Sequence, residues 1–112
     1  MRKTSQSPLS YLKPVCDKLE CNSSVRRVAR LILESVDGKP ILKSRTQRGW
    51  TGAAIYLASR LEEKKISQTG VSQACRIGLT TLNRFISVLN QEPEVIRCID
   101  RVIEQNLVQE ES

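Results

Sequence analysis

Apolar residues recur at helical spacing along most of this chain, and the most apolar stretch spans residues 49–61. Its apolar side chains fall at i, i+3, i+4, i+7, i+8 and i+11 of one helix face, namely Trp50, Ala53, Ala54, Leu57, Ala58 and Leu61. Most of the remaining face is uncharged as well. A helix that is nearly apolar on every side is usually buried among other helices. The pattern therefore predicts an alanine-rich central helix over residues 49–62, surrounded by a helical bundle.

Two further helices are predicted before the central one. The first is expected to begin at Pro8, which suits the first helical position, although Pro14 should kink this helix or delay its start. The second is expected to open at the capping cluster 22–24 and to end at Gly38, which supplies a left-handed cap. Their apolar faces consist of Leu9, Leu12, Cys16 and Leu19 in the first helix and of Val25, Val28, Ala29, Ile32, Leu33 and Val36 in the second.

Two helices joined by a tight turn are predicted after the central one. Ser67 can cap the first of them, the turn is expected at residues 76–78, and the second helix spans residues 79–90. The side chains expected to point inward are Val71, Ala74, Cys75, Leu82, Ile86 and Leu89. This order matches the layout of a helix-turn-helix unit, here residues 67–90. Any small bundle contains such pairs, so the layout is compatible with DNA recognition and with simple packing.

The last predicted helix, residues 92–107, is acidic and amphipathic. Glu92 and Glu94 lie at its positive end, as the helix dipole favours. Its apolar stripe consists of Val95, Ile96, Ile99, Val102, Ile103 and Leu107. The helix either packs on the bundle or serves as a docking surface, including one through which two copies of the chain form a homodimer. Residues 1–7 are expected to form a disordered basic tail and residues 108–112 a C-terminal tail.

Charge is unevenly distributed along the chain. Residues 1–91 hold 16 Lys and Arg against 6 Asp and Glu, a net charge of +10, whereas residues 92–112 hold 2 against 6, a net charge of −4. A segment this basic favours a polyanionic partner, with nucleic acid first and an acidic protein surface second. The candidates for contacts with phosphate or with an acidic partner are Arg26, Arg27 and Arg30, together with Lys39, Lys43, Arg45 and Arg48 in the connector before the central helix. A solvated surface is the alternative for these side chains.

The outward face of residues 79–90 carries side chains suited to reading bases. Asparagine can pair with adenine and arginine with guanine, while threonine can touch a thymine methyl group. In a helix-turn-helix the first residues of the second helix meet the base edges. The candidate DNA-binding residues are Gln68, Arg76, Thr80, Asn83, Arg84 and Ser87. An ordinary polar helix face is the alternative.

Metal, cofactor and enzyme chemistry find little support in the sequence. The four cysteines, at positions 16, 21, 75 and 98, form no C-x-x-C pair, the chain contains no histidine, and each cysteine stands where a small core residue fits. No phosphate-cradling glycine loop or hydrolase motif is present, so we expect no enzyme activity, no cofactor and no metal. The N-terminus lacks the apolar region of a secretory signal, and no uncharged run approaches the ~20 residues of a membrane span. The protein is therefore expected inside the cell, in a prokaryotic cytoplasm or a eukaryotic nucleus.

One longer set of strings is more specific than any single pattern. A-A-I-Y-L-A-S stands at residues 53–59, S-Q at 67–68, R-I at 76–77 and T-L at 81–82. Together they resemble the cyclin-like repeat of transcription factor IIB and of its archaeal counterpart, transcription factor B, and the match runs without a gap from Gly49 to Leu89. Ile86 stands at the aromatic position of the family pattern. Residues 15–33 are similar to the family's first two helices, so that the resemblance covers roughly residues 9–90.

The resemblance implies a fold in which a five-helix cyclin-like domain, residues 8–91, surrounds the alanine-rich helix and is followed by the C-terminal amphipathic helix. In the family's second repeat the helix-turn-helix lies beside the TATA element, and the two base-contacting positions correspond here to Thr80 and Asn83. The family's arginine is therefore absent, although Arg84, about 100° around the helix, could supply the charge. Phe85 replaces a polar surface residue and is expected to contact a partner. The family's zinc ribbon and second tandem repeat find no counterpart in these residues.

Two functions follow from these expectations. The first is a DNA-binding transcription factor, a reduced archaeal or archaeal-virus relative or one domain of a larger factor, which contacts double-stranded promoter DNA through the helix-turn-helix and the basic connector. The TATA-binding protein would be its partner. The alternative is a cyclin-like interaction module that regulates transcription without specific DNA binding, which the missing arginine, Phe85, Gly70 and the acidic last helix favour.

Overall fold

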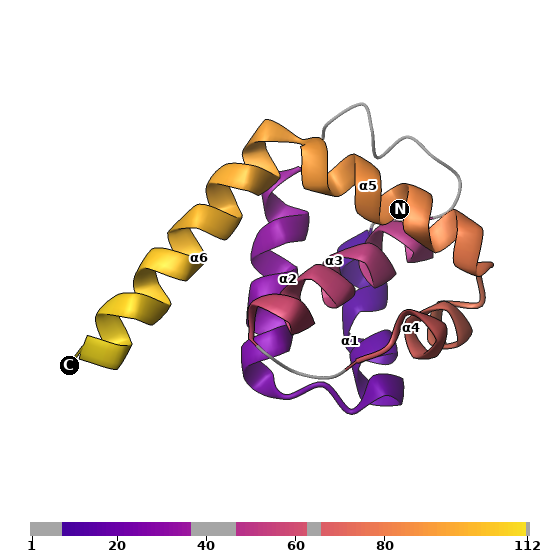
Figure 1. Ribbon diagram of the computed structural model, residues 1–112. Coiled ribbons are helices and arrows are strands. Elements are labelled where there is room, and N and C mark those ends of the chain that lie inside the picture. Colours follow the sequence, from indigo (N-terminus) through magenta and orange to yellow (C-terminus); the bar gives the residue numbers. More distant parts are fainter. Residues whose placement is uncertain (1–7, 37–46, 63–65, 112) are drawn as a thin grey trace, which may run out of the picture.

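The computed structural model describes residues 8–36, 47–62 and 66–111, with side chains between residues 9 and 105 of these ranges. Within them the chain forms six α-helices, drawn in Figure 1: α1 (Pro8–Leu19), α2 (Ser23–Ser35), α3 (Gln47–Leu61), α4 (Gln68–Cys75), α5 (Leu79–Gln91) and α6 (Pro93–Glu111). The predicted all-α class is confirmed, as are five bundle helices followed by a sixth.

Helix α3 is the centre of the molecule. It packs against α1, α2, α4 and α5, and every residue from Gly49 to Ser59 except Tyr56 is buried. This arrangement confirms the central position that the apolar pattern predicts for residues 49–62. Helix α6 lies against α2 and α5, and its C-terminal half extends away from the bundle (Figure 1).

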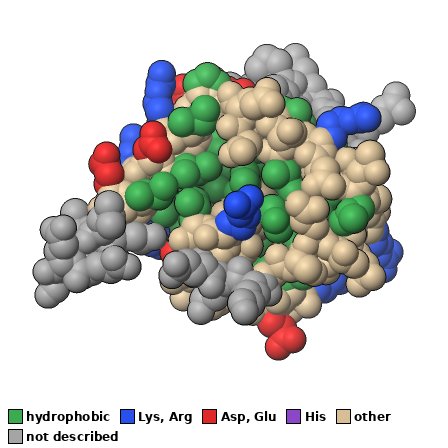
Figure 2. Space-filling view, viewed as in Figure 1, with side chains coloured by type: hydrophobic (Ala, Val, Ile, Leu, Met, Phe, Trp, Pro, Cys, Tyr) green, Lys and Arg blue, Asp and Glu red, His purple; other side chains and the backbone are tan. Residues whose placement is uncertain are grey.

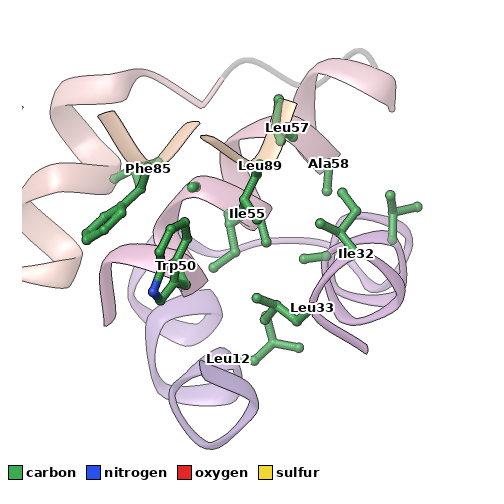
Figure 3. Packing of buried hydrophobic residues seen from close by; sticks show 14 of the residues in the cluster. Leu12, Ile32, Leu33, Trp50, Ile55, Leu57, Ala58, Phe85 and Leu89 are labelled. Carbon is green, nitrogen blue, oxygen red and sulfur yellow. The ribbon is translucent and has the colours of Figure 1, made fainter. Parts of the chain in front are cut away.

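The core joins side chains from α1 to α6 around this central helix, and part of it is drawn in Figure 3. Ile32 of α2, Ile55 of α3 and Leu89 of α5 have no exposed surface. Burial of each such side chain contributes about 1.5–3 kcal/mol relative to leaving it in water. The bundle is thus stabilised mainly by apolar contacts that converge on α3.

Side-chain caps begin two of the helices where the sequence predicts them. Asn22 Oδ1 accepts a hydrogen bond from the Val25 amide at 2.9 Å, and Ser67 Oγ accepts one from the Gly70 amide at 2.9 Å. Each cap satisfies one of the amides that the first turn of a helix leaves without a backbone partner.

Some boundaries differ from the prediction. Helix α1 starts at Pro8 and continues through the exposed Pro14 without a break, because water can compensate for one missing hydrogen bond on an exposed face. Helix α2 already ends at Ser35, and Gly38 lies outside the described residues. Helix α6 runs on to Glu111, since residues 108–111 contain no glycine or proline to stop it.

Phe85 fits into the space above a glycine of α3. A Cβ atom on Gly49 would overlap the Cε2 and Cδ2 atoms of the Phe85 ring. The ring also packs on Trp50, with 4.3 Å between the centroids and a 43° tilt. Phe85 is only 8% exposed, so the expectation that it contacts a partner is wrong. Ile86, expected to point inward, is half-buried.

Burial of the polar indole N–H of Trp50 costs free energy of folding. Its indole Nε1 is buried and has no acceptor among the described residues. A buried donor without a partner costs about 1–3 kcal/mol. The packing of the Trp50 ring in the core has to outweigh that cost.

The Gly49–Phe85 contact yields a prediction about stability. Gly49→Ala should lower the free energy of unfolding by about 1–3 kcal/mol, because the added methyl group displaces the ring even though alanine favours a helix. Phe85→Leu should free part of the space. Urea denaturation of both single variants and the double variant measures the coupling. A double variant that loses the full sum of the two single losses would contradict the overlap.

Candidate nucleic-acid interface

A helix-turn-helix is formed by α4, the three residues 76–78 and α5. The turn is stabilised by two backbone hydrogen bonds, from the Arg76 amide to the Gln73 carbonyl at 3.2 Å and from the Ile77 amide to the Ser72 carbonyl at 3.0 Å. This pair is typical of a helix end at which the following residue is left-handed. Arg76 is that residue, with φ 58° and ψ 45°. Glycine is usual at such a position, because other L-residues lose about 1–2 kcal/mol there.

Four of the predicted DNA-binding residues share one exposed face of α5. Thr80, Asn83, Arg84 and Ser87 follow the i, i+3, i+4, i+7 spacing, and all four are exposed. Leu82, Phe85 and Leu89 on the opposite side are buried against the bundle. The structure therefore brings these four side chains together on a surface whose orientation the core determines.

The first turn of α5 adds a positive potential to this face. Gly78 precedes α5 and has no side chain with which to cap it, and Gly78, Leu79 and Thr80 are exposed. The amides at a helix N-terminus attract anions such as phosphate. From residue 66 to residue 91 the chain carries Arg76 and Arg84 and no carboxylate. This charge distribution suits a phosphate backbone.

Arg48 is exposed in the first turn of α3 and directly precedes Gly49, on which the Phe85 ring of α5 packs. Burial raises the pKa of the Cys75 thiol, at the end of α4, to about 11, and the charge of Arg48 is the largest influence that opposes the rise. Gln68 is half-buried at the other end of α4, which spans about 12 Å over eight residues. Gln68 is thus separated from the turn by the whole length of α4.

The arginines of α2 line a separate cleft. It encloses about 450 Å³ between α1 and α2 and is lined by Leu9, Leu12, Lys13, Ser23, Arg26, Arg27 and Arg30. Arg26 Nη2 lies 3.7 Å from Asp17 Oδ1, and Arg30 Nε lies 3.5 Å from Glu34 Oε2. Such exposed pairs contribute at most about 1 kcal/mol and leave the arginines available to a partner.

The sequence patterns did not connect Lys13 with these arginines, because the two groups lie on different helices. Lys39, Lys43 and Arg45 of the predicted basic connector lie outside the described residues.

The four cysteines are part of the packing. Cys16 and Cys75 are buried, whereas Cys21 and Cys98 are half-buried. Burial, and then the neighbouring Cys21, raise the pKa of Cys16 to about 12, so its thiol stays protonated. Nowhere in the described ranges do three His, Cys, Asp or Glu residues come together as metal ligands would. No described helix is long and apolar enough to cross a bilayer.

The buried thiol of Cys75 gives a pH-dependent prediction. Its pKa rises from 9.0 to about 11 in the folded state, so the full stabilisation is present below pH 9 and is lost as the pH rises toward 11. Within this window the free energy of unfolding should fall by about 1.4 kcal/mol per pH unit for this group. Urea denaturation at several pH values should show a smaller slope for Cys75→Ala. An equal slope in both proteins would contradict the burial of the thiol.

Comparison with known proteins identifies a matching family and several relatives of this chain. The model of the transcription factor TFIIB repeat family matches residues 1–92, a range that includes α1 to α5. Transcription initiation factor IIB of Pyrococcus horikoshii is 32% identical over 85 residues, which cover 75% of this chain and 28% of that protein. Transcription initiation factor IIB 1 of Thermococcus kodakarensis is 31% identical over 85 residues, with the same coverage of 75% and 28%. Transcription initiation factor IIB 4 of Halobacterium salinarum is 29% identical over 84 residues, which cover 74% of this chain and 26% of that protein.

The chain thus spans about a quarter of the length of these archaeal relatives. The matched family consists of transcription factors rather than enzymes, in agreement with the expectation that the chain has no catalytic activity. Because the match covers the five helices that surround and include α3, this protein belongs to the transcription factor TFIIB repeat family.

Proposed function

We propose that this protein is a DNA-binding transcription factor that contacts double-stranded promoter DNA through α4 and α5. The observation that carries the proposal is the exposed face of α5, where Thr80, Asn83 and Arg84 stand beside Ser87. Polar side chains on a rigid, solvent-facing helix after a tight turn suit entry into the major groove.

Each group on this surface has a distinct role in the proposal. Asn83 and Arg84 read base edges, because their amide and guanidinium groups match the patterns of adenine and guanine. The methyl group of Thr80 and the side chain of Leu79, which is 42% exposed, contact thymine methyl groups. Arg76, Arg48 and the first amides of α5 bind phosphates and position the helix without selecting a sequence.

The relatives named above are transcription initiation factors, and the proposal extends to a partner in that process. The cleft between α1 and α2 combines apolar side chains with four cationic ones, which suits an acidic protein surface. We assign this cleft to a transcription partner such as the TATA-binding protein. A second candidate function, an interaction module that binds its partner through this cleft without reading DNA, rests on the same observation.

The base-reading face can be tested by titration. Wild-type protein should prefer an A/T-rich promoter duplex to a scrambled duplex, and Asn83→Ala/Arg84→Ala should lose that preference. Each base contact contributes about 1–3 kcal/mol, so affinity for the preferred duplex should fall at least about tenfold. Affinity should also fall linearly in the logarithm of the salt concentration, because phosphate contacts release counterions. Fluorescence anisotropy at several salt concentrations measures both effects.

A control variant, Arg97→Ala/Gln105→Ala on α6, removes one cation and one amide from exposed positions away from α5. It should retain the preference. If wild type and both variants bind the two duplexes equally and weakly, α5 is not a base reader. The interaction module would then be the better account.

Replacing the left-handed Arg76 by glycine tests the effect of its charge and the effect of its backbone strain in two separate measurements. Arg76→Gly should raise the free energy of unfolding by about 0.5–1 kcal/mol, since glycine adopts positive φ more readily. It should also weaken DNA binding and reduce the salt slope by about one, as expected when a phosphate contact is lost. Glu20 after α1 has φ 56°, so Glu20→Gly is the matched control and should raise stability without weakening DNA binding. An Arg76→Gly protein that binds DNA like wild type would exclude Arg76 from the interface.

A further inference from the structure

Helix α6 has more apolar surface than the bundle covers. Val95 and Val102 are almost completely buried, but Ile96 and Ile103 are 44% and 43% exposed. These two isoleucines are seven residues apart and therefore lie on one side of the helix, beside the half-buried Ile99. Helix α6 starts at Pro93, just after residue 92, where the match to the family ends. The exposed isoleucines therefore lie outside the matched repeat.

Ile99, beside the exposed isoleucines, lines a groove between α6 and the bundle. The groove encloses about 310 Å³ and is lined by Leu57, Arg60 and Leu61 of α3, Asn90 of α5 and Ile99 of α6. Figure 2 shows hydrophobic side chains gathered on this face, between α6 and the rest of the molecule. Clustered apolar surface of this kind is typical of protein–protein contacts.

The two edges of this apolar surface have opposite charges. On the bundle side, Arg60 is exposed at the end of α3 and lies 6.0 Å from the centroid of the Tyr56 ring. On the outer side of α6, Asp100 is exposed and neighbours both Ile96 and Ile103 at helical spacings of four and three residues. Glu104 extends the same edge, on which the cation of Arg97 is paired with Glu94 through Nη1 and Oε1 at 2.9 Å. One face therefore has an apolar centre, a basic edge and an acidic edge.

We infer that this face binds a second copy of the chain, with the two α6 helices parallel and related by a twofold axis along them. In that arrangement the outer edge of one α6 faces α3 of the other copy, so that Asp100 meets the partner's Arg60. Ile96 and Ile103 pack against the same residues of the partner. An antiparallel pair would instead place the two Asp100 side chains on the same edge, where they repel. The opposite charges on the two edges thus favour a parallel dimer over other occupants of the groove.

The dimer can be tested with the full chain and no DNA, so its outcome is independent of the proposed function. Light scattering after gel filtration should give twice the 12.6 kDa monomer mass at high protein concentration. Ile96→Asp and Ile103→Asp should each raise the dissociation constant at least about tenfold, because a charge replaces an apolar contact. Both positions are exposed in the monomer, so circular dichroism should show unchanged helix content. Gln105→Asp introduces the same charge elsewhere on α6 and should leave the dimer intact.

Charge exchange tests the parallel arrangement. Asp100→Arg and Arg60→Asp should each weaken the dimer about threefold to tenfold, and the double variant should return to within about threefold of wild type, because the exchanged charges attract again. A protein that stays monomeric at about 1 mM, or an Ile96→Asp variant that dimerises like wild type, would overturn the assignment of this face. A double variant no tighter than the single variants would overturn the pairing of Asp100 with the partner's Arg60.

Discussion

The contact between the Phe85 ring and the bare backbone of Gly49 determines how helix α5 sits on this protein. Because the ring occupies the space that a Cβ atom would fill and packs on Trp50, α5 has a defined rotation about its own axis. Gly52 has a corresponding role toward α4, since a Cβ atom there would come within 2.8 Å of Cys75 Sγ and 3.0 Å of Val71 Cγ1. Two glycines of the central helix thus hold both helices of the helix-turn-helix.

The rotation of α5 also determines which of its side chains are exposed to solvent. The side of α5 opposite Phe85 has to face water, and its polar residues therefore form one continuous face. The backbone of Arg76 is constrained as well, because the hydrogen bonds of the turn at the end of α4 require its left-handed conformation. Arg76 is exposed and stands two residues before Gly78, where α5 begins and the helix dipole favours an anion.

The family repeat accounts for the bundle, whereas the sites differ from the family pattern. Function depends on particular side chains placed on a fold, and Asn83 stands where the family pattern has an arginine. Helix α6 begins beyond the family match and has acidic side chains that offset only part of the positive charge of the bundle. The face proposed for DNA, on α5, and the face proposed for the dimer, on α6 and the end of α3, are thus different surfaces of the molecule.

The sequence by itself determined the helical class, the central place of α3, the capping residues Asn22 and Ser67, and the turn at residues 76–78. Periodicity and capping are local properties, so they can be read without knowing what packs where. Only the tertiary structure decided that Phe85 rather than Ile86 enters the core. Neighbouring positions on a helix differ by about 100°, and the space above Gly49 selects between them. The tertiary structure also places Lys13 in one cleft with the arginines of α2 and leaves Ile96 and Ile103 of α6 exposed. Both outcomes depend on which helices lie side by side.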